Sequence, residues 1–180
     1  IVASNTTDVN MGTWGDAGWN GTAGTVGDIT ISGSHGTGTD ITIDGALAVG
    51  TVNTSGVTVG TVTVVLDEAT VIGTTMTGGA GVDTFTGTGA ADTISGAGGA
   101  DALVGGSGAD TITGGAAVDT ITGGAGADNI TGGAGADKIV LGVENANGLD
   151  TVTLGVVDGT TILDIFDFTA QAAFIGTTTE

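Results

Sequence analysis

A large apolar side chain recurs at every ninth residue between Gly78 and Val140, with small or polar residues between the copies. Each stands in a short alternating run such as Thr111-Ile112-Thr113, and this period of two predicts a strand whose central side chain points inward. The six residues before each run are rich in Gly, which turns at positive φ without steric cost. We therefore expect turn–strand units, two of which complete one coil. The apolar positions are Phe85, Ile94, Leu103, Ile112, Ile121, Ile130 and Ile139.

The nine-residue unit also fixes Gly at its first position and Asp at its sixth, without a slip through seven copies. Beyond these copies the pattern weakens. Residues 69–77 keep Met76 but place Thr74 where Asp belongs, and residues 145–153 restore Asp150 and Val152 after a four-residue insertion. Worn terminal units are typical of a stacked solenoid. We predict a stack of such coils over 69–153, with core repeats at 78–140.

The flanking segments alternate apolar residues with Thr or Ser but lack the nine-residue period. Asp28 and Asp40 open two such runs twelve residues apart, and residues 162–168 (ILDIFDF) form a further strand-like run. Period-two alternation with Gly between the runs predicts strands. We expect an all-β fold: a β-rich Thr/Gly segment over 1–68, either β-helix-like or a small sandwich, and a β continuation or cap over 154–180.

The charge balance excludes several classes of partner. The chain has 20 acidic residues, one base (Lys138), 38 Gly and no Pro or Cys, for a net charge of −19. Nucleic acid and anionic membrane surfaces require Lys and Arg, and no apolar run approaches the roughly 20 residues of a membrane-spanning helix. The absence of Pro and of a Gly-X-Y period excludes collagen. Carboxylates on Gly-rich turns instead favour calcium, which takes oxygen ligands.

Stacked coils place equivalent residues of every second unit about 4.8 Å from each other, the spacing of strands. The aspartates then form two columns, in which adjacent carboxylates repel by about 1 kcal/mol in water unless a cation lies between them. Backbone carbonyls of the turns would complete each site. We predict several bound Ca²⁺ ions held by Asp83, Asp92, Asp101, Asp110, Asp119, Asp128, Asp137 and Asp150, with carbonyl oxygens from Gly105, Gly106, Gly108, Gly123, Gly124 and Gly126.

Calcium is also expected to contribute to folding. Burying one Ile or Leu in each nine-residue unit contributes about 1.5–3 kcal/mol. Ordering nine residues costs about 1.5 kcal/mol each, so the apolar core cannot hold the fold alone. We expect a loose array without calcium and a rigid one with it.

The unit GGxGxDxUx, where U is apolar, resembles the nonapeptide of RTX proteins. Ala90 and Ala117 depart from it at the fourth position, and Thr88 and Ala97 at the second. The resemblance implies a right-handed parallel β-roll with calcium between its turns, and type I secretion to the outside of the cell. The Thr-, Ala- and Gly-rich, Lys-poor composition further resembles the self-assembling S-layer proteins of Gram-negative bacteria. That implies a calcium-dependent structural protein of the cell surface which associates with itself; the alternative is the secretion and folding module of an RTX enzyme, toxin or adhesin.

No catalytic constellation stands out. His35 has no second His or Cys to work with, and neither a zinc-protease nor a nucleophile-elbow motif occurs. We therefore expect no enzymatic activity. Because the chain begins at Ile1 without a signal-peptide pattern, we expect it to be a piece of a longer protein.

Overall fold

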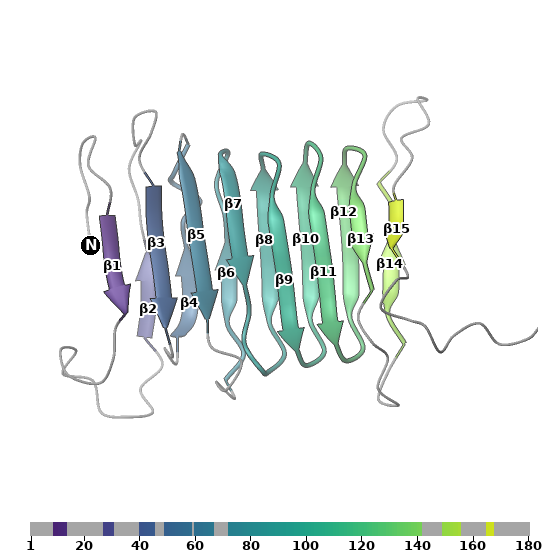
Figure 1. The fold of residues 1–180 in the computed structure, drawn as a ribbon, viewed down its shortest axis with the longest axis horizontal. Coiled ribbons are helices and arrows are strands. Elements are labelled where there is room, and N and C mark those ends of the chain that lie inside the picture. Colours follow the sequence, from purple (N-terminus) through teal and green to yellow (C-terminus); the bar gives the residue numbers. More distant parts are fainter. Residues whose placement is uncertain are drawn as a thin grey trace, which may run out of the picture.

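The computed structural model is a two-layered stack of β-strands (Figure 1). It describes residues 9–13, 27–30, 40–45, 49–58, 60–66, 72–141, 149–155 and 165–167. His35 lies outside these residues, as do 142–148 and 168–180. Within the described part no helix is long and apolar enough to cross a membrane.

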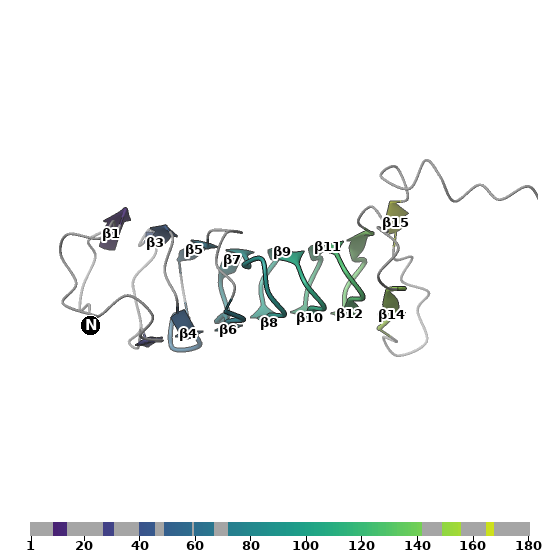
Figure 2. The same cartoon turned by 90° about the horizontal axis from the view of Figure 1, so that it is seen from below.

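Strands alternate between two sheets along the chain, and every pairing within a sheet is parallel. Figure 2 shows the two layers facing each other, with odd-numbered strands in one and even-numbered strands in the other. The odd sheet contains β1 (Val9–Thr13), β3 (Asp40–Gly45), β5 (Thr61–Leu66), β7 (Val82–Thr86), β9 (Ala102–Ser107), β11 (Thr120–Ala125), β13 (Lys138–Val140) and β15 (Ile165–Asp167). The even sheet contains β2 (Gly27–Thr30), β4 (Val49–Asn53), β6 (Thr75–Thr77), β8 (Thr93–Gly98), β10 (Thr111–Ala116), β12 (Asn129–Ala134) and β14 (Thr151–Thr153).

The register confirms a coil of two nonapeptides. Ile112 of β10 pairs with Ile94 of β8 on one side and with Ile130 of β12 on the other. Each partner lies two nonapeptides away along the chain, so consecutive units fall on opposite sheets. The prediction of an all-β parallel solenoid is therefore confirmed.

The central strands of the array, β8 to β12, are longer than expected. The alternation predicted three residues, such as Thr111–Thr113, but β10 runs for six and continues through Gly114, Gly115 and Ala116. Gly115 pairs with Gly133 in the next coil, so the first part of each glycine-rich stretch extends the sheet before the chain turns. The turn itself is correspondingly shorter than the six residues assigned to it.

The core is a row of stacked apolar side chains between the two sheets. All seven predicted eighth-position residues are at most 1% exposed, and Met76 of β6 is equally buried. Leu141 and Val152 pack against the end of this row. The nine-residue hydrophobic period therefore identified the core of the array correctly.

The coils before the repeats belong to the same two sheets. Asp40 of β3 pairs with Thr61 of β5, which pairs with Val82 of β7, so each of these coils is longer than two nonapeptides. The β-helix-like alternative for this segment is confirmed, and the separate sandwich is wrong. The core is also denser here, because Val62, Val64 and Leu66 of β5 are all buried. The assigned domain boundaries stay a prediction.

Candidate metal centre

The sixth-position aspartates lie where each turn enters the next strand. Because turns on one side of the solenoid stack directly on each other, the carboxylates form two columns inside the molecule, one beside each set of turns. All seven are at most 3% exposed, which is unusual for a charged side chain. The columns contain Asp83, Asp101, Asp119 and Asp137 on one side, and Asp92, Asp110 and Asp128 on the other.

One oxygen of each carboxylate links successive coils. The Oδ1 atom of Asp101 accepts a hydrogen bond of 2.8 Å from the backbone N–H of Asp83, 18 residues earlier. The same bond recurs up both columns. The N–H to Oδ1 distances are 2.8 Å for Asp92 to Asp110, 2.8 Å for Asp101 to Asp119, 3.0 Å for Asp110 to Asp128 and 2.9 Å for Asp119 to Asp137.

Asp150 extends the second column despite the inserted residues. Its Oδ1 accepts the N–H of Asp128 at 3.0 Å, across a separation of 22 residues. Val152 of β14 then pairs with Ile130 of β12, which returns the chain to register. The structure thus places Asp150 with the repeat aspartates, in the position that its local motif predicted.

The second oxygen is left without a partner in the later repeats. Oδ2 is buried and accepts no hydrogen bond in Asp101, Asp110, Asp119, Asp128 and Asp150. Buried polar atoms in proteins are almost always hydrogen-bonded, and an unpaired carboxylate oxygen is costly to bury. A row of such atoms fits a cation that is bound between the coils.

The first glycine of each unit borders these oxygens. A Cβ atom on Gly105 would collide with Oδ2 of Asp110 and with the carbonyl oxygen of Gly123 in the next coil. Gly114 stands in the same relation to Oδ2 of Asp119 and to a backbone carbonyl one coil on. Carbonyl and carboxylate oxygens therefore converge at the first position, and any side chain there would fill the space.

The other glycines serve the turn instead. Gly106 and Gly108 have φ values of 110° and 117°, and Gly124 and Gly126 have 116° and 138°. The expectation that glycine is needed throughout the unit for positive φ is thus wrong for the first position, where Gly105 needs only the space. Carbonyl ligation by the six predicted glycines stays a prediction.

Burial raises the pKa of the column carboxyls. Desolvation is the largest cause. It raises the pKa of Asp101 and Asp119 to about 6 and the pKa of Asp110 to about 7, although the backbone hydrogen bonds to these carboxylates lower their pKa values. Repulsion from neighbouring column carboxylates raises these pKa values further, and desolvation also raises the pKa of Asp128. An added positive charge between the coils would stabilise the ionised form of these carboxyls.

Side chains alone do not complete a metal site. Among the described residues, no three His, Cys, Asp or Glu side chains gather around one point. An ion in the columns must therefore take most of its ligands from backbone carbonyls. An all-oxygen set of carboxylates and carbonyls is what calcium prefers.

The sequence did not reveal that Asp83 and Asp92 differ from the later aspartates. Their Oδ2 atoms accept backbone hydrogen bonds, from Gly79 at 2.9 Å and from Thr88 at 2.6 Å. Two signals for Asp92 stood in the sequence: Thr88 replaces the second glycine, and Thr74, 18 residues before Asp92, replaces an aspartate. Gly79 gives no such signal for Asp83.

Comparison with known proteins agrees with this geometry. The profile of one protein family, described as the RTX calcium-binding nonapeptide repeat (four copies), matches residues 77–112 and again residues 113–145. No curated protein and no solved structure gave a match. RTX repeats bind Ca²⁺ and are typical of secreted, extracellular proteins. The nonapeptides within residues 77–145 are therefore RTX calcium-binding repeats.

Proposed function

We propose that this chain is the calcium-dependent folding and assembly segment of a secreted structural surface protein of the S-layer type. The observation that carries the calcium part is the row of buried, unpaired Oδ2 atoms in Asp101, Asp110, Asp119, Asp128 and Asp150. A folded array without cations leaves these charges unsatisfied. Binding of ions is thereby coupled to folding.

Calcium supplies positive charge between the coils, and the chain supplies the oxygen atoms. The turn carbonyls and the aspartates with unpaired Oδ2 atoms would hold the ions, while the Oδ1 hydrogen bonds keep successive carboxylates in register. If the outside calcium concentration exceeds the dissociation constant a hundredfold, each ion adds about 2.7 kcal/mol to stability. The acidic chain would stay unfolded in calcium-poor cytoplasm and fold after export.

The outer face of the even sheet supports the assembly part. From β6 to β14 its outward-facing residues pair in register in two rows, and none of them carries a charge. On a chain with a net charge of −19, such a face lets a second copy approach with little electrostatic repulsion. We call it the hydroxyl face; its residues are Thr75, Thr77, Thr93, Ser95, Thr111, Thr113, Asn129, Thr131, Thr151 and Thr153.

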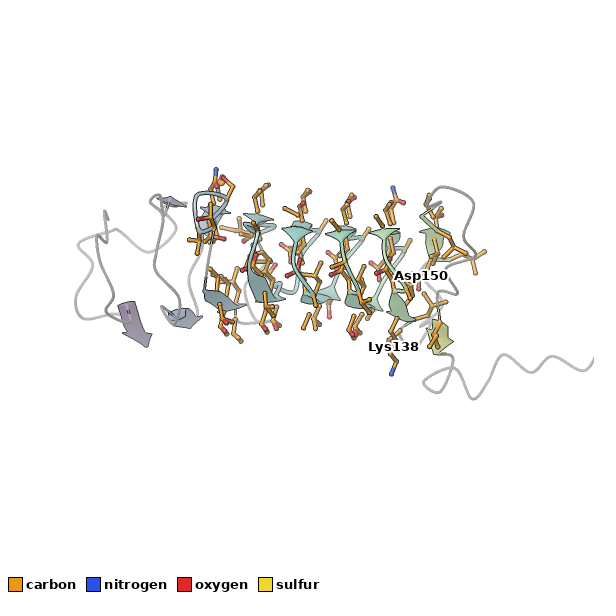
Figure 3. The ribbon with its side chains drawn as sticks, turned by 90° about the horizontal axis from the view of Figure 1, so that it is seen from above. Lys138 and Asp150 are labelled. Atoms are coloured by element: carbon orange, nitrogen blue, oxygen red, sulfur yellow. The ribbon has the colours of Figure 1, made fainter. Side chains whose placement is uncertain are left out.

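The opposite face is less uniform. Ala102, Val104 and Val140 interrupt its rows, and Lys138 projects from it (Figure 3). Two variants can therefore separate the faces. Thr113→Asp places a charge on the hydroxyl face, and Thr122→Asp places one at the equivalent position of the odd sheet.

Circular dichroism during a calcium titration tests the folding part, with magnesium as the control. We expect a cooperative gain of β signal with calcium alone. Full β structure in chelator, unchanged by calcium, would contradict calcium-driven folding.

Electron microscopy and light scattering of the calcium-loaded protein test the assembly part. We expect ordered sheets from the unchanged chain and from Thr122→Asp, and their loss in Thr113→Asp. A chain that folds with calcium but stays monomeric would favour the alternative, a folding and secretion module of an RTX enzyme, toxin or adhesin.

We propose no catalytic role for this segment. The part of the chain that the structure describes contains no His or Cys, and its buried carboxylates are committed to the columns. Carboxylates that bind calcium are poor general bases.

A further inference from the structure

The turns of the array fall into two conformational classes. In the five turns from Gly96 onward, the second and fourth residues both have positive φ, including Ala97 and Ala117. No residue in turns 78–83 and 87–92 has positive φ, although Gly79 and Gly81 could adopt it. We call 78–83 and 87–92 the early turns and the other five the later turns; these are 96–101, 105–110, 114–119, 123–128 and 132–137.

The early turns satisfy their own aspartates. The N–H of Gly79 donates to Oδ2 of Asp83 at 2.9 Å. In the second early turn, the N–H of Thr88 donates to Oδ2 of Asp92 at 2.6 Å, and the Thr88 hydroxyl lies 3.1 Å from both carboxylate oxygens. The equivalent Oδ2 atoms of Asp101 and Asp110 have no such donor.

The coils beneath the early turns account for the difference. Ala80 donates its N–H to the carbonyl of Val57 at 3.3 Å, and the Thr88 hydroxyl donates to the carbonyl of Ile72 at 3.3 Å. Val57 precedes the nonapeptides, and Ile72 lies in the worn unit 69–77, where it replaces the glycine of the fourth position. The early turns therefore stack on backbone of a different shape, while each later turn stacks on another nonapeptide turn.

The columns also end at the early turns. Asp83 pairs in register with Val62 of β5, and Asp92 accepts the N–H of Thr74 at 2.5 Å. Neither of those neighbours carries a carboxylate. An ion between either early turn and the coil before it would have only the carboxylate of Asp83 or Asp92 beside it. That carboxylate already accepts hydrogen bonds, and the preceding coil supplies no carboxylate.

We propose that calcium binding begins at turn 96–101, and that the two early turns are metal-free joints between the calcium array and the coils before it. This inference rests on the proposed calcium function and assigns Asp83 and Asp92 as positioning residues whose Oδ2 atoms do not bind calcium. Val62, Val64 and Leu66 give the preceding coil a core that does not depend on the ion. Calcium-driven order then extends from β7 and β8 toward β14.

Asp92 and Asp110 form a matched pair for the test, because they are neighbours in one column and 18 residues apart. We would count the calcium ions bound by the full chain, by equilibrium dialysis and native mass spectrometry, in Asp92→Asn and Asp110→Asn. Asp110→Asn should lose at least one ion. Asp92→Asn should keep the count of the unchanged chain.

Equal losses in the two variants would overturn the inference. An unchanged chain that binds no calcium would overturn the proposed function as well, so the two failures are distinguishable. Hydrogen exchange of the unchanged chain in chelator gives an answer that does not depend on how the variants fold. Protection retained in β5 and β7 but lost in β10–β13 is expected, and uniform exchange from β5 to β13 would contradict a metal-free joint.

Discussion

Two alanines adopt a backbone conformation that the other later turns give to glycine. Ala97 has a φ of 74° and Ala117 a φ of 81°. For an L-residue with a Cβ atom this left-handed region costs roughly 1–2 kcal/mol. Each alanine therefore stores strain that the rest of the roll overcomes.

Replacing Ala117 by Gly should stabilise the calcium-loaded protein by about 0.5–1 kcal/mol, because the relief of strain exceeds the added entropy of the unfolded chain. Chemical denaturation at saturating calcium measures the change. Ala116→Gly is the matched control, since Ala116 lies in β10 without positive φ and should lose stability instead. A loss of stability in both variants would contradict backbone strain at Ala117.

The first glycine of a unit should tolerate no side chain at all. Gly105→Ala places a methyl group against Oδ2 of Asp110 and the Gly123 carbonyl, and we expect a loss of about 1–3 kcal/mol together with weaker calcium binding. Calorimetric titration and thermal denaturation report the two effects. Calcium affinity equal to that of the unchanged chain would show that this space does not belong to a site.

These residues mark the limit of what the sequence can predict. The nine-residue period located the Asp columns, and the local motif located Asp150, because both follow from the spacing alone. The period cannot show that Gly106 is needed for its positive φ, whereas Gly105 is needed because a side chain there would collide with neighbouring oxygen atoms. Nor can it separate Asp83 from Asp101, since that difference comes from the coil stacked beneath.

Among the elements, each of the strands β7 to β13 buries one large apolar side chain. Ile112 of β10 is fully buried between Ile94 and Ile130 of the neighbouring strands. The remaining residues of β10 are Thr, Gly and Ala, which add little apolar surface. The sequence predicted this core residue but not the full strand, because alternation ends at Thr113 while pairing continues through the glycines.

Ile112→Ala should therefore destabilise the calcium-loaded protein by about 2–5 kcal/mol, the usual cost of a large-to-small change in a core. Denaturant unfolding followed by circular dichroism measures it. Val118→Ala is the control, because Val118 is 55% exposed and should change stability by less than about 0.5 kcal/mol. A similarly small loss of stability in both variants would mean that the row of buried apolar side chains contributes little to the stability of the fold.

At the scale of the whole molecule, buried charge makes stability depend on pH. In the folded state the carboxyls of Asp101 and Asp110 have pKa values of about 6 and about 7, against 3.8 for an unperturbed Asp carboxyl. Between these values the folded state binds more protons than the unfolded state. Without calcium, the free energy of unfolding should fall as pH rises through this window.

We expect the calcium-free protein to gain β structure on acidification from pH about 7.5 to about 5, and calcium affinity to weaken over the same range because protons compete for the carboxylates. Circular dichroism in calcium-free buffer and calcium titrations at both pH values check this. Stability that rises with pH in the absence of calcium would contradict buried, unpaired carboxylates.

The alternation of units between two sheets constrains how such a chain can change length during evolution. Duplication of two adjacent nonapeptides inserts one coil and leaves every downstream residue on its own face and in its own column. Duplication of a single nonapeptide would move all later units to the opposite sheet, carrying Lys138 onto the hydroxyl face and exchanging the two Asp columns. Among descendants the array can therefore change length by whole coils of two nonapeptides. A single nonapeptide, although it is the unit that repeats in the sequence, cannot be added or lost alone without this exchange of faces.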